Sequence, residues 1–232
     1  MRKTGKALQW PWKRGISRNA RRDRITMNLL KKLFRRPVPI RDVEALADFI
    51  DAQSAFITQK GIFEYSRARA GHYAKVLFAE EGFARSVDRA RWQAFPLGLS
   101  MVGEMIEGVV ASGAGTERRQ LLDRLTSVVL SVLDRYPVSP SIGEEAWQEA
   151  RRELAHRLDL VGAHAPKRVM DIPDALAKAY FDTMPIHEKL RGRDFGTTRN
   201  YLSVCLCNIH DEFVARADVA ALRQALSSGD KA

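Results

Sequence analysis

The spacing of apolar residues constrains the fold of this chain most strongly. From Ile40 onward, apolar side chains recur at intervals of three and four residues, as in the series Val43, Leu46, Ile50 and Ile57. This is the period of an α-helix that buries one face. No stretch of useful length alternates apolar and polar residues in the way that a half-exposed strand does. We therefore predict an all-α protein.

Prolines and glycine-containing segments divide this pattern into nine helical segments, which amount to about eight helices. The predicted helical segments cover residues 43–70, 72–78, 83–94, 96–111, 117–135, 144–160, 173–184, 197–216 and 219–226. The break between the third and fourth is expected at Pro96, and Thr116 is expected to cap the fifth. No linker long enough to separate two cores follows Pro39, so residues 37–232 are predicted to form a single bundle or helical array.

The first 36 residues form a basic arm. They hold thirteen Lys and Arg and one acid, Asp23, which gives a charge of +12, whereas residues 37–232 sum to −2. Short basic termini with Pro and Gly are usually solvated, and we expect this arm to be largely disordered. Basic clusters of this kind also grip phosphates without base specificity. Nucleic-acid binding by the arm alone is therefore a hypothesis, which would show as affinity that falls steeply with salt. Because the body is nearly neutral, a nucleic-acid partner is the less favoured expectation.

Residues 27–36 are predicted to form a short amphipathic helix within this arm. Leu29, Leu30, Leu33 and Phe34 share one helical face, and four bases occupy the other. The four bases are Lys31, Lys32, Arg35 and Arg36. One hypothesis places this helix on an anionic membrane surface, and the other docks its leucines on the body. A further hypothesis is that translation begins at Met27, which would reduce the arm's charge to +4.

Targeting and redox signals point to a cytoplasmic protein. No signal peptide is visible at the start of the chain, and the longest uncharged runs are too short to cross a bilayer. The two cysteines, Cys205 and Cys207, are two residues apart in a predicted helix and point to different sides, so they do not easily pair. We expect a cytoplasmic location, peripheral to the inner membrane if the amphipathic helix binds there.

Ser100 is the first candidate for catalysis. It stands within residues 98–103, Gly-Leu-Ser-Met-Val-Gly, which is similar to the G-x-S-x-G elbow of ester hydrolases. The second glycine is one residue late, and the elbow requires a turn from strand to helix. Ser100, Glu104 and Glu107 follow one another at i, i+4 and i+7. We therefore expect them to form a solvated helix face.

Two histidines are candidates for acid–base chemistry. His187 and His210 each stand beside a carboxylate in the sequence. Adjacent residues on a helix do not face each other, so each histidine needs a partner from elsewhere in the fold. His210 also belongs to a polar stripe of the helix at 197–216. That stripe either lines a cleft or holds a buried, hydrogen-bonded histidine.

One pair of residues has the spacing of metal ligands. Glu153 and His156 form a Glu-x-x-His pair, as in di-iron helical bundles. Those sites need a second pair and two further glutamates, and this pair stands in a strongly charged segment. We expect no metal and no cofactor.

The segment at residues 187–200 is the candidate anion-binding site. Its arginines converge in sequence on a predicted helix start, where free N–H groups attract anions. The residues expected to bind a phosphate or carboxylate are Arg191, Arg193, Thr197, Thr198 and Arg199, with Thr197 or Thr198 as the helix cap. The alternative is a charged loop held by pairs between these arginines and Asp194 or Glu188.

A fifteen-residue run gives the chain a family resemblance. The run is Pro-Lys-Arg-Val-Met-Asp-Ile-Pro-Asp-Ala-Leu-Ala-Lys-Ala-Tyr at residues 166–180, and it follows a Leu-Phe-Arg-Arg start and a helical core. It resembles the bacterial ubiquinol–cytochrome c chaperone family, which implies an all-helical fold that assists respiratory-complex assembly at the inner membrane. The chain departs from that family at residues 95–100, Phe-Pro-Leu-Gly-Leu-Ser, where the family has a leucine-rich helix with a histidine. It is also similar to small alphaproteobacterial all-helical proteins of unassigned function that are sometimes labelled esterase.

Two functions are therefore expected from different classes. The first is a non-enzymatic interaction or assembly factor with a protein partner. Its mark would be a hydrophobic or charged groove. The second is a small hydrolase, for which Ser100 must lie close to His187 or His210 and to an acid.

Overall fold

The computed structural model describes residues 38–228, apart from the side chain of Glu188. These residues form nine α-helices and three short 3-10 helices, and this part of the chain contains no strand. The prediction of an all-α fold is confirmed. The predicted arm at 1–36, with its amphipathic helix at 27–36, lies outside the described residues.

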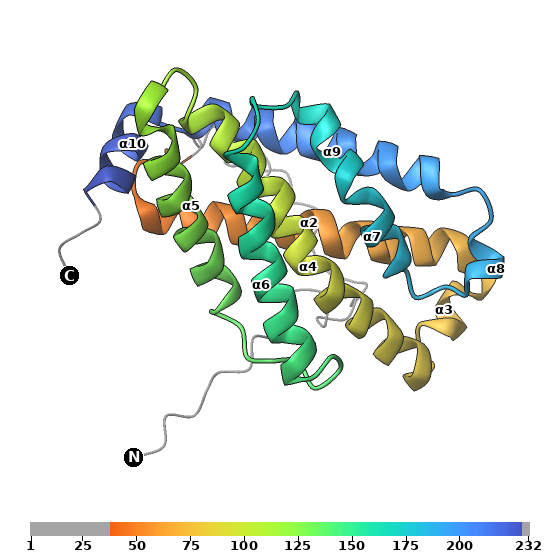
Figure 1. Ribbon diagram of the computed structural model, residues 1–232. Coiled ribbons are helices and arrows are strands. Elements are labelled where there is room, and N and C mark those ends of the chain that lie inside the picture. Colours follow the sequence, from red (N-terminus) through yellow and green to blue (C-terminus); the bar gives the residue numbers. More distant parts are fainter. Residues whose placement is uncertain (1–37, 229–232) are drawn as a thin grey trace, which may run out of the picture. The chain divides into compact units, whose positions relative to one another are not determined.

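The helices follow one another through short connections (Figure 1). The α-helices are α2 (Val43–Ala70), α3 (Ala74–Leu77), α4 (Glu81–Val110), α5 (Arg118–Leu133), α6 (Glu144–Val161), α7 (Ala177–Asp182), α8 (Glu188–Arg191), α9 (Phe195–Arg216) and α10 (Val219–Ser227). The 3-10 helices are η2 (Gly71–Tyr73), η3 (Gly115–Glu117) and η4 (Val169–Ala175).

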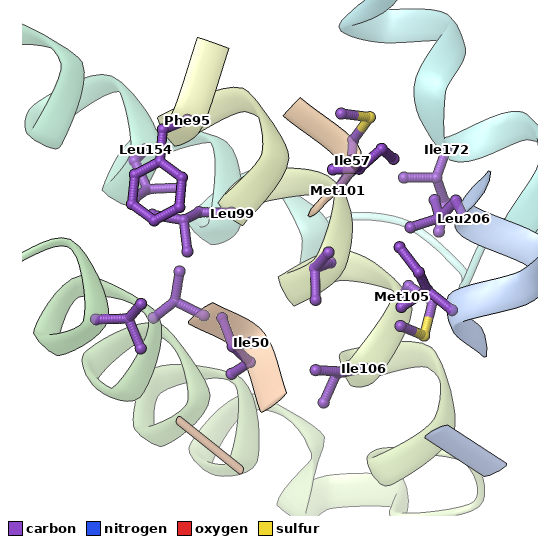
Figure 2. Close-up of a cluster of buried hydrophobic side chains, with 14 of the residues drawn as sticks. Ile50, Ile57, Phe95, Leu99, Met101, Met105, Ile106, Leu154, Ile172 and Leu206 are labelled. Carbon is purple, nitrogen blue, oxygen red and sulfur yellow. The ribbon is translucent and has the colours of Figure 1, made fainter. Parts of the chain in front are cut away.

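Helix α4 is the central element of the fold. It packs against α2, α5, α6 and α9, and apolar side chains from these helices meet around it (Figure 2). Ile50, Leu99, Met105 and Leu206 are each no more than 1% exposed. Burial of such side chains contributes most of the favourable free energy of folding. The helical period of the sequence therefore corresponds to faces that meet in one core.

The predicted helix break at Pro96 is wrong. Helix α4 runs without interruption from Glu81 to Val110, with Pro96 inside it. A proline in a helix interior removes one hydrogen bond and costs about 3 kcal/mol. Here Ala94 and Leu99, on either side, are fully buried. Packing of this turn against neighbouring helices offsets the cost of the proline.

Two predicted helix starts also differ from the structure. Thr116 lies in η3 and does not cap α5, which begins at Arg118 without a side-chain cap. The predicted helix at 173–184 is divided into η4 and α7, because the backbone at Leu176 leaves regular helical geometry at φ −112°. In both places a 3-10 turn precedes the α-helix, as is common at helix ends.

Helix α8 was not predicted, and the predicted helix at 72–78 is divided into η2 and α3. The remaining helix boundaries agree with the prediction to within a few residues. The stripe of α5 at Leu121, Leu125 and Val129 is buried, as is the α9 stripe that includes Phe213. The chain from Val38 onward is one compact unit. Its two ends differ, since α10 lies at one end and α3 and α8 at the other (Figure 1).

Candidate functional site

A groove between α4 and α6 is the main concave surface that we consider as a functional site. Its volume is about 390 Å³. The lining comes from α4, from α6 and from Ile142, which precedes α6. The lining residues are Trp92, Gln93, Pro96, Leu97, Ser100, Ile142, Ala146, Glu149, Ala150, Glu153, Leu154 and Arg157. Most of this lining is apolar, which is typical of sites that bind apolar groups.

Ser100 lies in the wall of this groove. Its side chain is 4% exposed, and its hydroxyl has no hydrogen-bond partner among the described residues. A buried hydroxyl without a partner is costly and is uncommon in folded proteins. Two polar atoms of the groove lining, the Ser100 hydroxyl oxygen and Arg157 Nε, therefore have no hydrogen-bond partner within residues 38–228, although Arg157 also forms an ion pair with Glu153.

The predicted solvated face of Ser100, Glu104 and Glu107 is wrong. Ser100 and Glu107 are 4% and 2% exposed, and the side chain of Glu104 is 12% exposed. The reason is the central place of α4, which has neighbours on several sides. A helix in the middle of a bundle has no face left for solvent.

Charged residues of α6 form the rim of the groove. Glu153 pairs with Arg157 at 2.8 Å, one helical turn away. Glu149 accepts a hydrogen bond from Arg152 Nε at 3.1 Å. Between these glutamates and the start of the helix, Ala146 presents only a methyl group to the groove. The lining that α6 contributes is therefore charged at Glu149, Glu153 and Arg157 and has small side chains at Ala146 and Ala150.

A second, smaller pocket lies where α4 approaches the segment after α6. Its volume is about 200 Å³, and its lining includes Glu104, Glu107, His164, Lys167 and His210. Glu104 pairs with Lys167 at 2.8 Å. His164 Nδ1 lies 2.9 Å from the carbonyl oxygen of Ala165. The pocket thus contains ionisable groups that already have partners within the chain.

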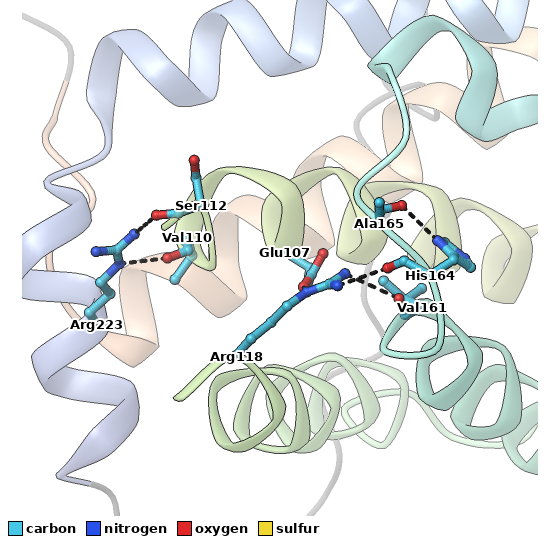
Figure 3. Close-up of polar contacts among 8 residues, drawn as sticks. All are labelled: Glu107, Val110, Ser112, Arg118, Val161, His164, Ala165 and Arg223. Carbon is cyan, nitrogen blue, oxygen red and sulfur yellow. Dashed lines mark hydrogen bonds and ion pairs between the residues drawn. The ribbon is translucent and has the colours of Figure 1, made fainter. Parts of the chain in front are cut away.

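Glu107 and Arg118 form a buried ion pair beside this pocket (Figure 3). Arg118 Nε donates to Glu107 Oε1 at 2.6 Å, and its two Nη atoms donate to the carbonyls of His164 at 2.8 Å and Val161 at 3.2 Å. The hydrogen bond to Glu107 raises the pKa of the Arg118 guanidinium. This arginine joins α4 and α5 to the end of α6, so we assign the pair a structural role.

The three catalytic candidates lie in three different places. Ser100 lines the groove between α4 and α6. His210 lines the second pocket, with its Nδ1 3.3 Å from Asp211 Oδ1. His187 precedes α8, where its Nδ1 accepts a hydrogen bond from the Lys189 backbone N–H at 3.2 Å. No hydrogen bond joins any two of them within the described residues, so the structure does not assemble a serine–histidine pair.

The arginines predicted to bind an anion make contacts inside the protein. Arg191 donates to the carbonyls of Ile186 and Phe181, both at 2.8 Å. Arg199 pairs with Asp174 through two hydrogen bonds of 2.6 and 2.8 Å, and this hydrogen bonding lowers the pKa of Asp174. Arg193 is exposed. The anion site at 187–200 stays a prediction.

The predicted threonine cap of α9 is wrong. The helix begins at Phe195, so Thr197 and Thr198 lie within its first turn. Thr198 is buried, and its N–H donates to the Asp194 carbonyl at 2.9 Å. The aspartate precedes the helix without a side-chain cap because its carboxylate accepts from Tyr65 and pairs with Arg69 instead. Tertiary contacts thus take priority over local capping here.

The described part of the chain has neither a metal-binding cluster nor a membrane-spanning helix. It contains no group of three or more His, Cys, Asp or Glu side chains arranged to hold a metal. Glu153 lines the groove and His156 is exposed. None of the helices within residues 38–228 has both the length and the apolar character needed to cross a membrane.

The groove itself was missed by the sequence analysis. Its signal is a pair of small residues, Ala146 and Ala150, one turn apart and off the buried stripe of Trp147 and Leu154. Recognising it required knowing that α4 lies alongside. The chain matches no family model, no curated protein and no solved structure, so its function has to be inferred from this geometry.

Proposed function

We propose that this chain is a non-catalytic binding protein that holds an amphipathic helix of a partner protein in the groove between α4 and α6. The observation that carries the proposal is the apolar groove with the unpartnered Ser100 hydroxyl in its wall. A role as an assembly factor, peripheral to the inner membrane, is the form of this function that the sequence resemblance favours.

The shape of the groove favours a helix as its occupant. Amphipathic helices commonly lay their apolar face between two helices of a binding protein. Ala146 and Ala150 stand one turn apart on α6, and their small side chains allow a close approach. Leu97 and Ile142 also line the groove and add apolar surface.

The charge of α6 indicates the chemistry of the partner's polar face. Residues 144–161 contain five acids and three Lys or Arg, so the helix carries −2. Two of these acids, Glu149 and Glu153, stand on the rim of the groove. A partner helix with an apolar face, basic flanks and one polar side chain for Ser100 would match this surface.

Hydrolysis is the less favoured function for this groove. A serine nucleophile needs a base within hydrogen-bond reach. The ionisable residues that line the groove are Glu149, Glu153 and Arg157, and both glutamates pair with arginines along α6. His187 and His210 lie outside this lining.

Site-specific photo-crosslinking in cells tests the proposal. A photoreactive benzophenone amino acid replaces Gln93, which is exposed and lines the groove. We expect cross-links to one protein, mapped by mass spectrometry to an amphipathic helical segment with basic flanks. The same residue placed at Ser127, exposed on α5, is expected to give no such product.

A blocking variant provides the matched control. Ala146→Arg places a long cation in the groove, whereas Gln148→Arg makes the same change on the same helix at an exposed position outside the lining. We expect Ala146→Arg to abolish the cross-link from position 93 and Gln148→Arg to preserve it. Equal cross-linking in both variants, or cross-links spread over unrelated proteins, would overturn the proposal.

A further inference from the structure

One end of the helical unit combines exposed apolar side chains with basic residues. It consists of residues 67–76, which run from the last turn of α2 into α3, and residues 187–194, which surround α8. Figure 1 shows α3 and α8 at the same end of the unit, opposite α10. We call these two segments the basic end.

Specific contacts join the two segments of the basic end. Arg69 donates to the carbonyl of Leu190 and pairs with Asp194 at 2.9 Å. The hydroxyl of Tyr65, one turn earlier on α2, donates to the same carboxylate at 3.0 Å. Gly192 turns the chain at φ +56°, beside the Arg69 guanidinium, in a conformation that glycine adopts most readily. The basic end is therefore one built surface.

The apolar residues of the basic end project into solvent. Tyr73, Leu190 and Val76 are 77%, 65% and 61% exposed, and neither η2 nor α3 contains a buried residue. Exposed apolar side chains that gather at one place commonly mark a binding surface. The fold therefore gains little from these side chains, which points to a role outside the core.

The charge of the basic end differs from that of the remaining structure. Residues 67–76 hold three Lys or Arg and no acid, and residues 187–194 hold three against two acids, so together they carry +4. Residues 38–228 as a whole carry −2, from 24 bases and 26 acids, which leaves −6 on the remainder. Lys75, Lys189 and Arg193 are exposed and form no ion pair with any described residue. The unit is thus polarised toward an anionic partner.

We propose that the basic end docks on an anionic phospholipid bilayer. Tyr73, Val76 and Leu190 would enter the boundary between headgroups and acyl chains, where tyrosine and aliphatic side chains are favoured. Lys75, Lys189 and Arg193 lie within three residues of them in sequence and would meet the lipid phosphates. This inference does not depend on what occupies the groove between α4 and α6.

A lipid surface fits these features better than other anionic partners. A nucleic-acid backbone would pair with the bases but would leave the exposed aliphatic side chains in water. A protein interface usually has few charges at its centre, whereas here Val76 and Leu190 are each next to a Lys in sequence and Tyr73 is two residues from Lys75. Alternation of basic and apolar groups is typical of segments that lie in a membrane interface.

Vesicle co-sedimentation of the full chain tests this proposal. The vesicles contain phosphatidylcholine alone or with 30% phosphatidylserine. The end variant carries Lys75→Gln, Lys189→Gln and Arg193→Gln. We expect the wild-type chain to prefer the anionic vesicles and the end variant to bind them about tenfold or more weakly. Tyr73→Ser with Leu190→Ser is expected to weaken binding as well, with all charges kept.

The matched control removes three positive charges elsewhere. Arg152→Gln, Arg168→Gln and Lys178→Gln change exposed residues on other parts of the unit, and the arm is identical in both triple variants. We expect less than a threefold effect. Equal losses in the two triple variants would assign lipid binding to net charge or to the arm and overturn the proposal, as would unchanged binding in the serine variant. Preference for single-stranded RNA over vesicles, lost in the end variant, would also overturn it.

Discussion

The groove between α4 and α6 and the basic end both expose apolar side chains. They differ in shape, in charge and in the length of the helices that form them. The groove is concave, has glutamates on its rim and is carried by helices of 30 and 18 residues. The basic end carries +4 and consists of the last turn of α2 and helices of three and four residues. A concave apolar surface selects a partner by shape, whereas a protruding basic one selects it by charge.

The two surfaces also relate differently to the core. Residues that line the groove, such as Leu154 and Pro96, are buried parts of the bundle. Tyr73 and Leu190 at the basic end are mostly exposed. The groove should therefore be hard to change without loss of stability, while the basic end should tolerate substitution. The following predictions test this contrast, from the largest expected effect to the smallest.

Truncation of a groove residue should destabilise the protein most. Leu154 is 1% exposed and lines the groove. Leu154→Ala leaves a cavity in the core and should lower the free energy of unfolding by about 2–5 kcal/mol. Leu190→Ala, at a position that is 65% exposed, should change it by less than about 0.5 kcal/mol. Urea unfolding followed by circular dichroism measures both, and similar values for the two variants would contradict the contrast.

A methyl group added behind the groove should also be destabilising. A Cβ at Gly98 would lie 2.8 Å from Thr58 Cγ2 and 3.0 Å from the Ser54 carbonyl oxygen. We expect Gly98→Ala to cost about 1–3 kcal/mol through overpacking between α2 and α4.

Gly108, ten residues later on α4, provides the control. An added Cβ there meets its nearest heavy atom, Pro166 Cβ, at 3.9 Å. Gly108→Ala should therefore stabilise the protein by about 0.5–1 kcal/mol, because alanine favours a helix interior. Thermal or urea unfolding gives the sign of each change. If Gly98→Ala stabilised the protein, α2 and α4 would not pack as closely at Gly98 as the structure shows.

Removal of the Ser100 hydroxyl should separate stability from binding. This hydroxyl has no hydrogen-bond partner among the described residues, so Ser100→Ala should leave stability unchanged or raise it by up to about 1 kcal/mol. It should weaken the photo-crosslink from position 93 about two- to tenfold, because a hydrogen bond to the partner is lost.

Another buried serine gives the comparison for Ser100. The Ser66 hydroxyl donates to the Ile62 carbonyl at 2.7 Å, so Ser66→Ala should cost about 0.5–1.5 kcal/mol in unfolding experiments. It should leave the cross-link unchanged. If Ser100→Ala destabilised the protein as much as Ser66→Ala, the hydroxyl would already have a partner in the free protein.

Loss of the contact between α2 and α8 should loosen the basic end alone. Arg69→Met removes the pair with Asp194 and the hydrogen bond to Leu190. Because this arginine is partly exposed, we expect a local destabilisation of about 1 kcal/mol. Hydrogen exchange should then accelerate about fivefold for the backbone amides of residues 188–194, with no change in α6. Arg67→Met removes an exposed pair within α2 and should have no such effect.

Acidification should slightly weaken the attachment of α6 to the end of α5. Asp134 accepts two hydrogen bonds of 2.9 Å from Arg151, which joins α6 to the end of α5. These bonds lower the pKa of Asp134 below the ordinary value of 3.8. The folded state then binds fewer protons than the unfolded state, so the stabilisation is complete above about pH 5 and is lost as pH falls through the lowered pKa.

The effect of this exposed pair should be less than about 1 kcal/mol. The urea concentration at the midpoint of unfolding, determined at pH 7, 4 and 3, measures this contribution to stability. Asp134→Asn should lose less stability than the wild-type chain between pH 5 and 3, since its side chain does not titrate. An identical acid response in both proteins would indicate that the pair contributes nothing.

The sequence predicted the helices well because their apolar period reflects burial directly. The series Leu46, Ile50 and Ile57, for example, is fully buried, and its prediction needed no knowledge of its neighbours. Pro96 shows where this reasoning fails, since a local rule for ending a helix was outweighed by packing on both sides. Glu107 shows the same failure for burial, because its partner Arg118 comes from the next helix.

The candidate sites were less accessible to sequence reasoning. Ser100 was a candidate for catalysis in the sequence, and that role stays a prediction. Its surroundings depend on the neighbouring α6, which no local pattern specifies. The arginines at 187–200 were recognised as a cluster, yet the internal partners of Arg191 and Arg199 lie 5 to 25 residues away in sequence. Function at a surface depends on which elements meet there, and that information is absent from the period of a single helix.

Parallel photo-crosslinking from the two surfaces tests the central claim most directly, namely that the groove and the basic end bind different partners. The benzophenone amino acid is placed at Gln93 in one variant and at Tyr73 in another, both exposed positions, in the full chain in cells. We predict a protein adduct from position 93 and a phospholipid adduct from position 73. The account would be contradicted by adducts of the same kind from both positions. It would also be contradicted if neither position gave more adduct than the control variant with the benzophenone amino acid at position 127.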